Sequence, residues 1–200
     1  MKALFATLFI LSATLPSDAE EAKKRDWSMS HATLEEIIAS YDQITQILGP
    51  VSGDYKFELF EGLPHPRWEP NLLASESKRG ISFEDHGFLF YEQARRVTEA
   101  DTVAVRRILR LEKNYTRFQG FKMCGGFHPD FLAKLSGESG IVSVQICLGC
   151  GEARIFKGAQ IVHCDLGAES HRFLEAILEE YYLERPDKKP VEHVVGGNGG

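Results

Sequence analysis

Three of the four cysteines of this chain, together with one histidine, lie in two short segments. "CGGFH" places Cys124 and His128 four positions apart, and "CLGC" places Cys147 and Cys150 three positions apart. Thiolates and imidazoles are common zinc ligands, and a C-x-x-C sequence at the tip of a β-hairpin directs two sulfur atoms toward one centre. Glycines beside both pairs allow the positive φ angles that such a turn needs. The spacing therefore predicts a Cys3His zinc site formed by these four residues.

The same four positions are also compatible with disulfide chemistry. A hairpin between the two segments brings both to one end of the sheet, and metal binding and cross-linking need that proximity equally. The disulfide alternatives are Cys124 with Cys147 or Cys150, or a redox-active Cys147–Cys150 pair. The neighbouring His163 and Cys164 are substitute metal ligands, although a buried structural role is the simpler interpretation of Cys164.

Two familiar C-x-x-C sites do not fit the surrounding sequence. A thioredoxin-type motif opens a helix, whereas "EARIFKG" after Cys150 has the pattern of a strand. A covalently bound c-type haem needs histidine directly after the second cysteine, where this chain has Gly151. No nucleophile elbow, zinc-protease motif or nucleotide-binding loop occurs. In an enzymatic alternative, Asp130 or Glu152 acts as the base beside an open metal site.

The block "CGGFHPDF…VQICLGCGEARIF", about residues 122 to 156, resembles one found in small exported bacterial proteins of unknown function. In those proteins a C-G-G-F-H-x-D segment precedes a strand and a C-x-x-C-G/H knuckle. The resemblance covers about a fifth of the chain and implies that Cys124, His128, Cys147 and Cys150 act as one unit. It implies no activity.

The N-terminus has the pattern of a secretory signal peptide. A basic "MK" precedes the apolar run "ALFATLFILSATL", and Ser17 and Ala19 are the small residues of a cleavage site. We expect residues 1–19 to be removed, 20–32 to form a flexible lead-in, 33–186 to form one domain, and 187–200 to be a disordered tail. The protein is then exported, periplasmic or extracellular, with no stable membrane anchoring after cleavage.

Composition restricts the partners. The chain of 200 residues has 29 acidic and 23 basic side chains, a formal net charge of −6. Nucleic-acid binding and adhesion to anionic membranes both need a basic surface, so neither is expected. The predicted partner is a protein or a small molecule, of a kind that the sequence does not specify.

Hydrophobic periodicity predicts an α+β fold of about three helices around an antiparallel meander. The helices are expected from Thr33, from Thr98 and from about Ala168 to Glu184, the last ended by Pro186. Thr33 with Glu36, and Thr98 with Asp101, form capping boxes. Strands are expected at 55–60, in 81–93 with a break at Gly87, and in "FHPDFLAKL", "GIVSVQICL" and "EARIFKG", of which the last three form the meander.

Side-chain positions follow from the same periodicity. In the second helix, Val103, Val105, Ile108, Leu109 and Leu111 are predicted to be buried. Arg106, Arg107 and Arg110 are predicted to face outward. His65, His86 and His171 stand alone in the sequence, and surface or structural roles are expected for them.

These observations favour an exported binding or interaction module with a structural zinc site over an enzyme. A site closed by four protein ligands leaves no position for a catalytic water. Two alternatives remain at this stage: a metal-dependent or thiol-redox enzyme that uses Cys147 and Cys150, and an exported protein with two structural disulfides.

Overall fold

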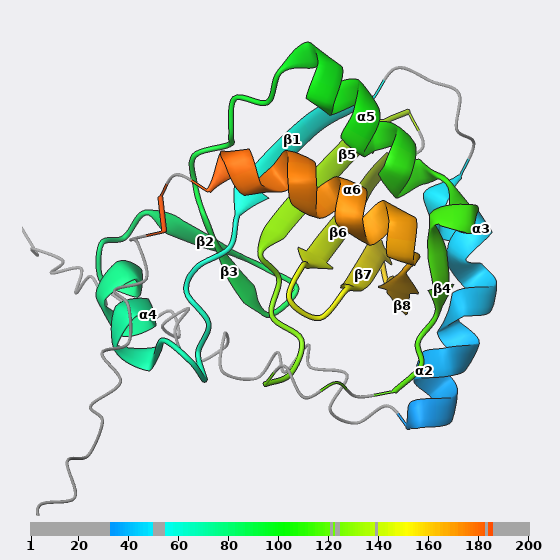
Figure 1. Cartoon of the computed structure of the whole chain (residues 1–200), viewed down its shortest axis with the longest axis horizontal. Coiled ribbons are helices and arrows are strands. Elements are labelled where there is room, and N and C mark those ends of the chain that lie inside the picture. Colours follow the sequence, from blue (N-terminus) through cyan, green and yellow to red (C-terminus); the bar gives the residue numbers. More distant parts are fainter. Residues whose placement is uncertain are drawn as a thin grey trace, which may run out of the picture.

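The computed structural model describes residues 33–49, 55–120, 122, 125–138, 140–182 and 184–185 (Figure 1). The predicted signal peptide, lead-in and C-terminal tail lie outside the described residues, as do Cys124 and Pro186. The helices are α2 (Leu34–Ser40), η2 (Tyr41–Gln43), α3 (Ile44–Leu48), α4 (Pro70–Ser77), α5 (Glu99–Arg110), η3 (Glu112–Asn114), α6 (Ala168–Leu178) and η4 (Glu179–Tyr181). The strands are β1 (Lys56–Glu61), β2 (Ser82–Asp85), β3 (Phe88–Tyr91), β4 (Tyr115–Arg117), β5 (Phe131–Gly137), β6 (Gly140–Cys147), β7 (Glu152–Lys157) and β8 (Gln160–Leu166).

The centre of the fold is a six-stranded antiparallel sheet with the order β1-β5-β6-β7-β8-β4. The predicted α+β class is confirmed. The meander is larger than predicted, because β8 adds a fourth strand and β1 and β4 extend the two edges. Strands β2 and β3 form a separate hairpin. Its turn, at His86 and Gly87, is the predicted break. Among the described residues, no helix has the length and apolar character needed to cross a membrane.

One face of the sheet carries the hydrophobic core. Alternate side chains of β5 to β8 point to this face, where α3, α5 and α6 cover them (Figure 1). The fully buried members include Phe131, Val144, Ile146, Ile155 and Leu174. The opposite face is more polar and contacts the β2–β3 hairpin, since Gln145 Nε2 donates to Asp85 O at 2.7 Å.

The helix caps are where the sequence predicted them. Both hydrogen bonds of the Thr33–Glu36 capping box are present. Thr98 Oγ1 accepts from the backbone N–H of Asp101 at 3.1 Å, but the Thr98 N–H donates to Tyr181 Oη at 3.2 Å, so only half of the second predicted capping box is formed. Helix α4 was not predicted, because its residues follow a proline-rich stretch that favours a loop.

Two side chains of α5 are placed differently from the prediction. Val103 is 58% exposed, whereas Arg110 is only 5% exposed. The Arg110 guanidinium lies 3.9 Å from the centroid of the Tyr55 ring, so the residue just before β1 covers this arginine. The prediction assigned every apolar residue of the helix to the core, but α5 buries only the stripe that contains Val105 and Leu109.

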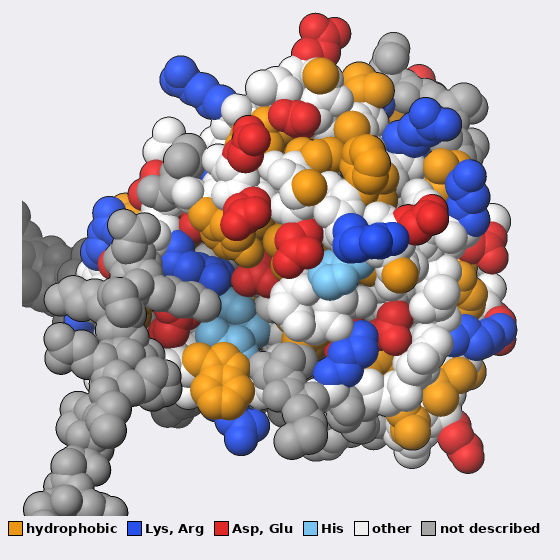
Figure 2. Space-filling model, in the orientation of Figure 1, with side chains coloured by type: hydrophobic (Ala, Val, Ile, Leu, Met, Phe, Trp, Pro, Cys, Tyr) orange, Lys and Arg blue, Asp and Glu red, His pale blue; other side chains and the backbone are white. Residues whose placement is uncertain are grey.

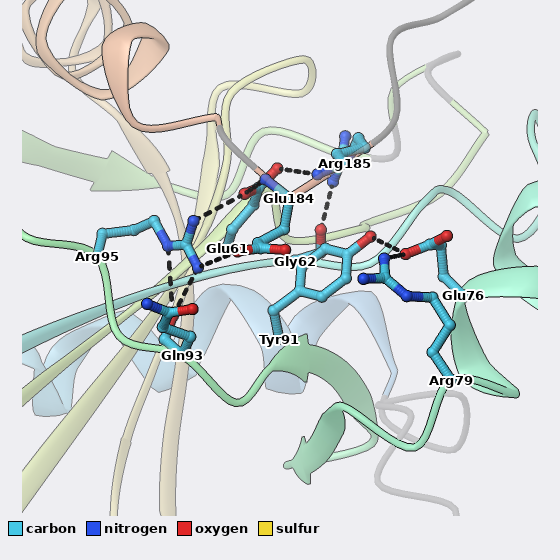
Figure 3. A network of polar contacts seen from close by, with 9 residues as sticks. All are labelled: Glu61, Gly62, Glu76, Arg79, Tyr91, Gln93, Arg95, Glu184 and Arg185. Carbon is cyan, nitrogen blue, oxygen red and sulfur yellow. Dashed lines mark hydrogen bonds and ion pairs between the residues drawn. The ribbon is translucent and has the colours of Figure 1, made fainter.

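Buried Glu61 connects the end of β1 to the end of the C-terminal helix (Figure 3). Its carboxylate accepts the backbone N–H groups of Glu184 at 2.8 Å and Arg185 at 3.0 Å. Arg95 Nη1 lies 3.7 Å from the same carboxylate, and both side chains are almost fully buried. Arg185 Nη2 then donates to the carbonyl oxygens of Gly62 and Leu63. This network fixes the chain after η4 against the sheet.

Replacing Glu61 by alanine is expected to lower the free energy of unfolding by about 3–5 kcal/mol, because it removes a buried carboxylate partner of Arg95 and leaves the backbone N–H groups of Glu184 and Arg185 without their acceptor. Urea unfolding measures the loss. Glu58 on the same strand is the matched control: its ion pair with Lys56 is exposed, so Glu58→Ala is expected to cost about 0–1 kcal/mol. Equal losses for the two variants would contradict this role of Glu61.

Candidate functional site

Residues Cys147 to Gly151 form the connection between β6 and β7, here named the cysteine turn. Gly151 has φ +65°, and its N–H donates to Leu148 O at 3.3 Å. The Cys150 N–H donates to Cys147 Sγ at 3.2 Å. A glycine at the last position adopts this φ without strain, so the turn can return directly into β7.

The segment Gly125–Asp130 lies against the cysteine turn. Gly125 and Gly126 have φ of +90° and +99°, in the region that glycine favours. Cys150 Sγ lies 3.7 Å from Gly126 O. The Asp130 carboxylate accepts the Leu148 N–H at 2.8 Å. The described part of the first segment and the second segment therefore meet, as the hairpin argument predicted.

The Cys147 thiol is enclosed by protein. The residue is 4% exposed. Burial raises the pKa of Cys147 to about 12, although backbone N–H groups of His128 and Cys150 oppose the shift. A thiol with such a pKa is almost wholly protonated at neutral pH and is a poor nucleophile.

The cysteines differ in oxidation state. Cys150 is disulfide-bonded, whereas Cys147 and Cys164 are free thiols. Cys124 lies outside the described residues. Because two of the four cysteines are free, the chain can form at most one intrachain disulfide. The alternative with two structural disulfides therefore does not fit this structure. A Cys147–Cys150 pair is not formed.

The predicted metal ligands are only partly gathered. Among the described residues, no three histidine, cysteine, aspartate or glutamate side chains come together as a metal-binding group. The His128 ring packs against His65, with centroids 4.7 Å apart. Cys164 belongs to the hydrophobic core, so it lies on the opposite face of the sheet from the side chain of Glu152. The zinc site stays a prediction.

The histidines that stand alone in the sequence all have contacts in the fold. His65 touches His128, and burial lowers the pKa of His65. His171 Nε2 lies 2.6 Å from Leu148 O in the cysteine turn. The His86 ring stacks on Phe156 at 3.9 Å. The contacts of His65 with the Gly125–Asp130 segment and of His171 with the cysteine turn had no sequence signal, because the segment after β1 and α6 come from distant parts of the chain.

The two carboxylates proposed as bases are already engaged. Asp130 accepts from Leu148 N–H and faces Arg185 Nη1 at 3.4 Å. Glu152 Oε2 lies 2.9 Å from His163 Nε2, and both side chains are buried. Lys122 Nζ reaches Asp165 at 2.8 Å and Glu152 at 3.6 Å. These pairs balance the buried charges, and they hold the polar face of β7 and β8 together.

Three neighbouring polar side chains on this face have buried atoms for which the described part of the chain supplies no hydrogen-bond partner. They are Gln145, Arg154 and His163, which are directly paired across β6, β7 and β8. The atoms are Gln145 Oε1, Arg154 Nε and His163 Nδ1. The Arg154 guanidinium lies 4.2 Å from the Phe127 ring centroid, and burial lowers the pKa of Arg154 to about 10.

A second candidate site lies on the outer surface of α5 and α6. Two adjoining hollows, of about 450 and 530 Å³, meet at Glu169 and Phe173. Phe173 and Val103 are 62% and 58% exposed. We name this region the α5–α6 surface; it comprises Val103, Ala104, Arg107, Ile108, Glu169, Arg172, Phe173, Ala176 and Ile177. Sequence reasoning missed it because Val103 was assigned to the core.

No protein-family model, curated protein or solved structure matches this chain. The candidate sites are therefore interpreted from their own geometry.

Native protein is expected to resist thiol modification, because Cys147 and Cys164 are both buried and burial raises the pKa of each thiol. In a colorimetric thiol assay near neutral pH, two thiols should react only after denaturation. Reduction should then raise the intact mass by about two hydrogens, those of one disulfide. Rapid reaction of Cys147 in the native protein would contradict the enclosed site.

Zinc content measured on the same sample tests the zinc prediction. About one zinc per chain with all four thiols reduced would support a Cys3His site, and absence of zinc in oxidised protein with two free thiols would support the cross-link.

His163 predicts a pH dependence of stability. Burial lowers the pKa of His163 below the 6.5 of an unperturbed histidine, although the hydrogen bond to Glu152 opposes this. The unfolded chain therefore binds the proton first as the pH falls. The contribution of neutral His163 to the free energy of unfolding is fully present above the pKa that this histidine has in the unfolded chain. It is lost as the pH falls through the lower pKa of His163 in the folded protein.

The free energy of unfolding should thus decrease more steeply on acidification from about pH 7.5 to 5 in the wild type than in His163→Gln. Urea unfolding at several pH values gives the dependence of the unfolding free energy on pH for both proteins. The carboxylates titrate in both proteins, so the difference between the two slopes reports on His163. Parallel slopes would show that His163 has no lowered pKa.

Proposed function

We propose that this protein is an exported interaction module, in which a cross-linked sheet presents the α5–α6 surface to a protein partner. The partner's surface carries an apolar side chain for the hollow beside Phe173, and charges of both signs around it. Export rests on the N-terminal signal sequence pattern.

The observation that carries this proposal is the exposure of Phe173 beside two adjoining hollows. Exposed Val103 lines a further hollow, which shares Arg107 with the first of these two. Aromatic side chains that remain exposed near a hollow are typical anchors of protein interfaces. Arg107 lines the same hollow, and arginine is enriched at such interfaces.

The state of the cysteine turn supports binding rather than catalysis. Cys147 is enclosed, its pKa is raised to about 12, and Cys150 is disulfide-bonded. We propose the predicted Cys124–Cys150 pairing as this disulfide; Cys147 and Cys164 are free thiols, and Cys124 lies outside the described residues. In this proposal that disulfide anchors the Gly125–Asp130 segment to the sheet, a structural role that the predicted zinc site would also serve.

Site-specific photo-crosslinking in exporting cells tests the proposal. A photoreactive phenylalanine analogue at position 173 is expected to form a discrete crosslinked product, because Phe173 would lie within the interface. Ile141 is the matched control: it is 56% exposed, and it points to the other face of the sheet from buried Val142. The analogue at position 141 should give no such product. Equal products at both positions, or none at 173, would overturn the proposal.

A further inference from the structure

The charges of the α5–α6 surface are arranged along its length. The two helices are antiparallel, since Tyr181 Oη lies 2.6 Å from Asp101 Oδ2 at one end and Gly167 N–H donates to Asn114 O at the other. The start of α5 therefore lies beside the end of α6.

One end of the surface is acidic and the other is mainly basic. The exposed side chains at the acidic end are Glu99, Glu175, Glu179 and Glu180, and those at the basic end are Arg107, Lys113 and Arg172. Figure 2 shows this separation, with red side chains mostly over the left part of the helical face and blue ones toward its right. Glu112 and Glu169 are exposed acidic exceptions at the basic end.

The apolar side chains occupy the region between the two ends. Phe173 of α6 and Val103 of α5 are the large exposed hydrophobic residues here. A two-fold axis through this region would reverse the surface, so that each acidic end would meet a basic end and the two apolar centres would face each other. Such self-complementarity is what an isologous dimer interface requires.

We infer that the partner of the α5–α6 surface is a second copy of this chain, related by a two-fold axis near Phe173. This inference rests on the proposed function, because it names the partner of the proposed interaction module. A uniformly acidic partner would be repelled by Glu175 and Glu179, and a uniformly basic one by Arg107 and Arg172. A second copy presents the opposite sign at both ends.

Sedimentation equilibrium of the mature chain tests the dimer. We expect dimers that weaken as salt is added, because charged pairs at the edge of an interface are screened. Phe173→Glu places a charge at the apolar centre and should raise the dissociation constant at least about tenfold. Ile141→Glu, an equally exposed change on the other face, should leave it unchanged. Circular dichroism melting of each variant confirms that it is folded.

A pair of charge-reversed chains gives a sharper test. One chain carries Arg107→Glu and Arg172→Glu, and the other carries Glu175→Lys and Glu179→Lys. Each alone would place like charges together at both ends of the interface and should dimerise at least about tenfold more weakly. Mixed in equal amounts, they should form heterodimers, since opposite charges then meet at both ends.

Two outcomes would overturn the inference. In the first, the wild-type chain is still monomeric at about 100 μM, a concentration at which a dimer with a Kd near 1 μM would be almost fully formed. In the second, the mixture of the two charge-reversed chains associates no better than either chain alone. A monomeric chain whose position 173 still crosslinks to a different protein would refute the dimer and leave the interaction module standing. If position 173 crosslinks to nothing, both fail.

Discussion

The Asp130 carboxylate joins three parts of the chain that are far apart in sequence. It accepts the N–H of Leu148 in the cysteine turn and faces Arg185 beyond the last helix. The backbone N–H of Asp130 also donates to Ile146 O at 2.7 Å, so the residue sets the approach of β5 to β6. Because Arg185 also binds the carbonyl groups after β1, one carboxylate ties the turn, the central strands and the C-terminal segment together.

The alternation of side chains across β6, β7 and β8 gives the sheet two chemically different faces. Val144, Ile155 and Val162 form a row in the core, while the adjacent row on the other face contains Gln145, Arg154 and His163. A shift of one residue in register would exchange these rows and bury the charges under α5 and α6. The polar face is stable because its carboxylates are paired with Lys122 and His163.

The two candidate sites differ in how far their side chains are buried, and this difference indicates different roles. Cys147, Leu148 and Cys150 of the cysteine turn are buried, and the N–H groups of Leu148 and Cys150 are hydrogen-bonded, which is the character of a structural element. The α5–α6 surface is open, and the apolar side chains of Phe173 and Val103 are exposed among charges. Binding energy is available at a surface of this kind, because association removes apolar area from water.

By itself the sequence determined the features that depend on near neighbours. The Thr33 and Thr98 caps, the break at Gly87 and the glycine-rich turn at Cys150 follow from local hydrogen bonding and backbone freedom. Only the tertiary structure decided which apolar side chains would be covered, because that depends on the neighbours of each helix. Val103 is thus exposed and Arg110 buried, and His171 and Asp130 reach the cysteine turn from distant segments.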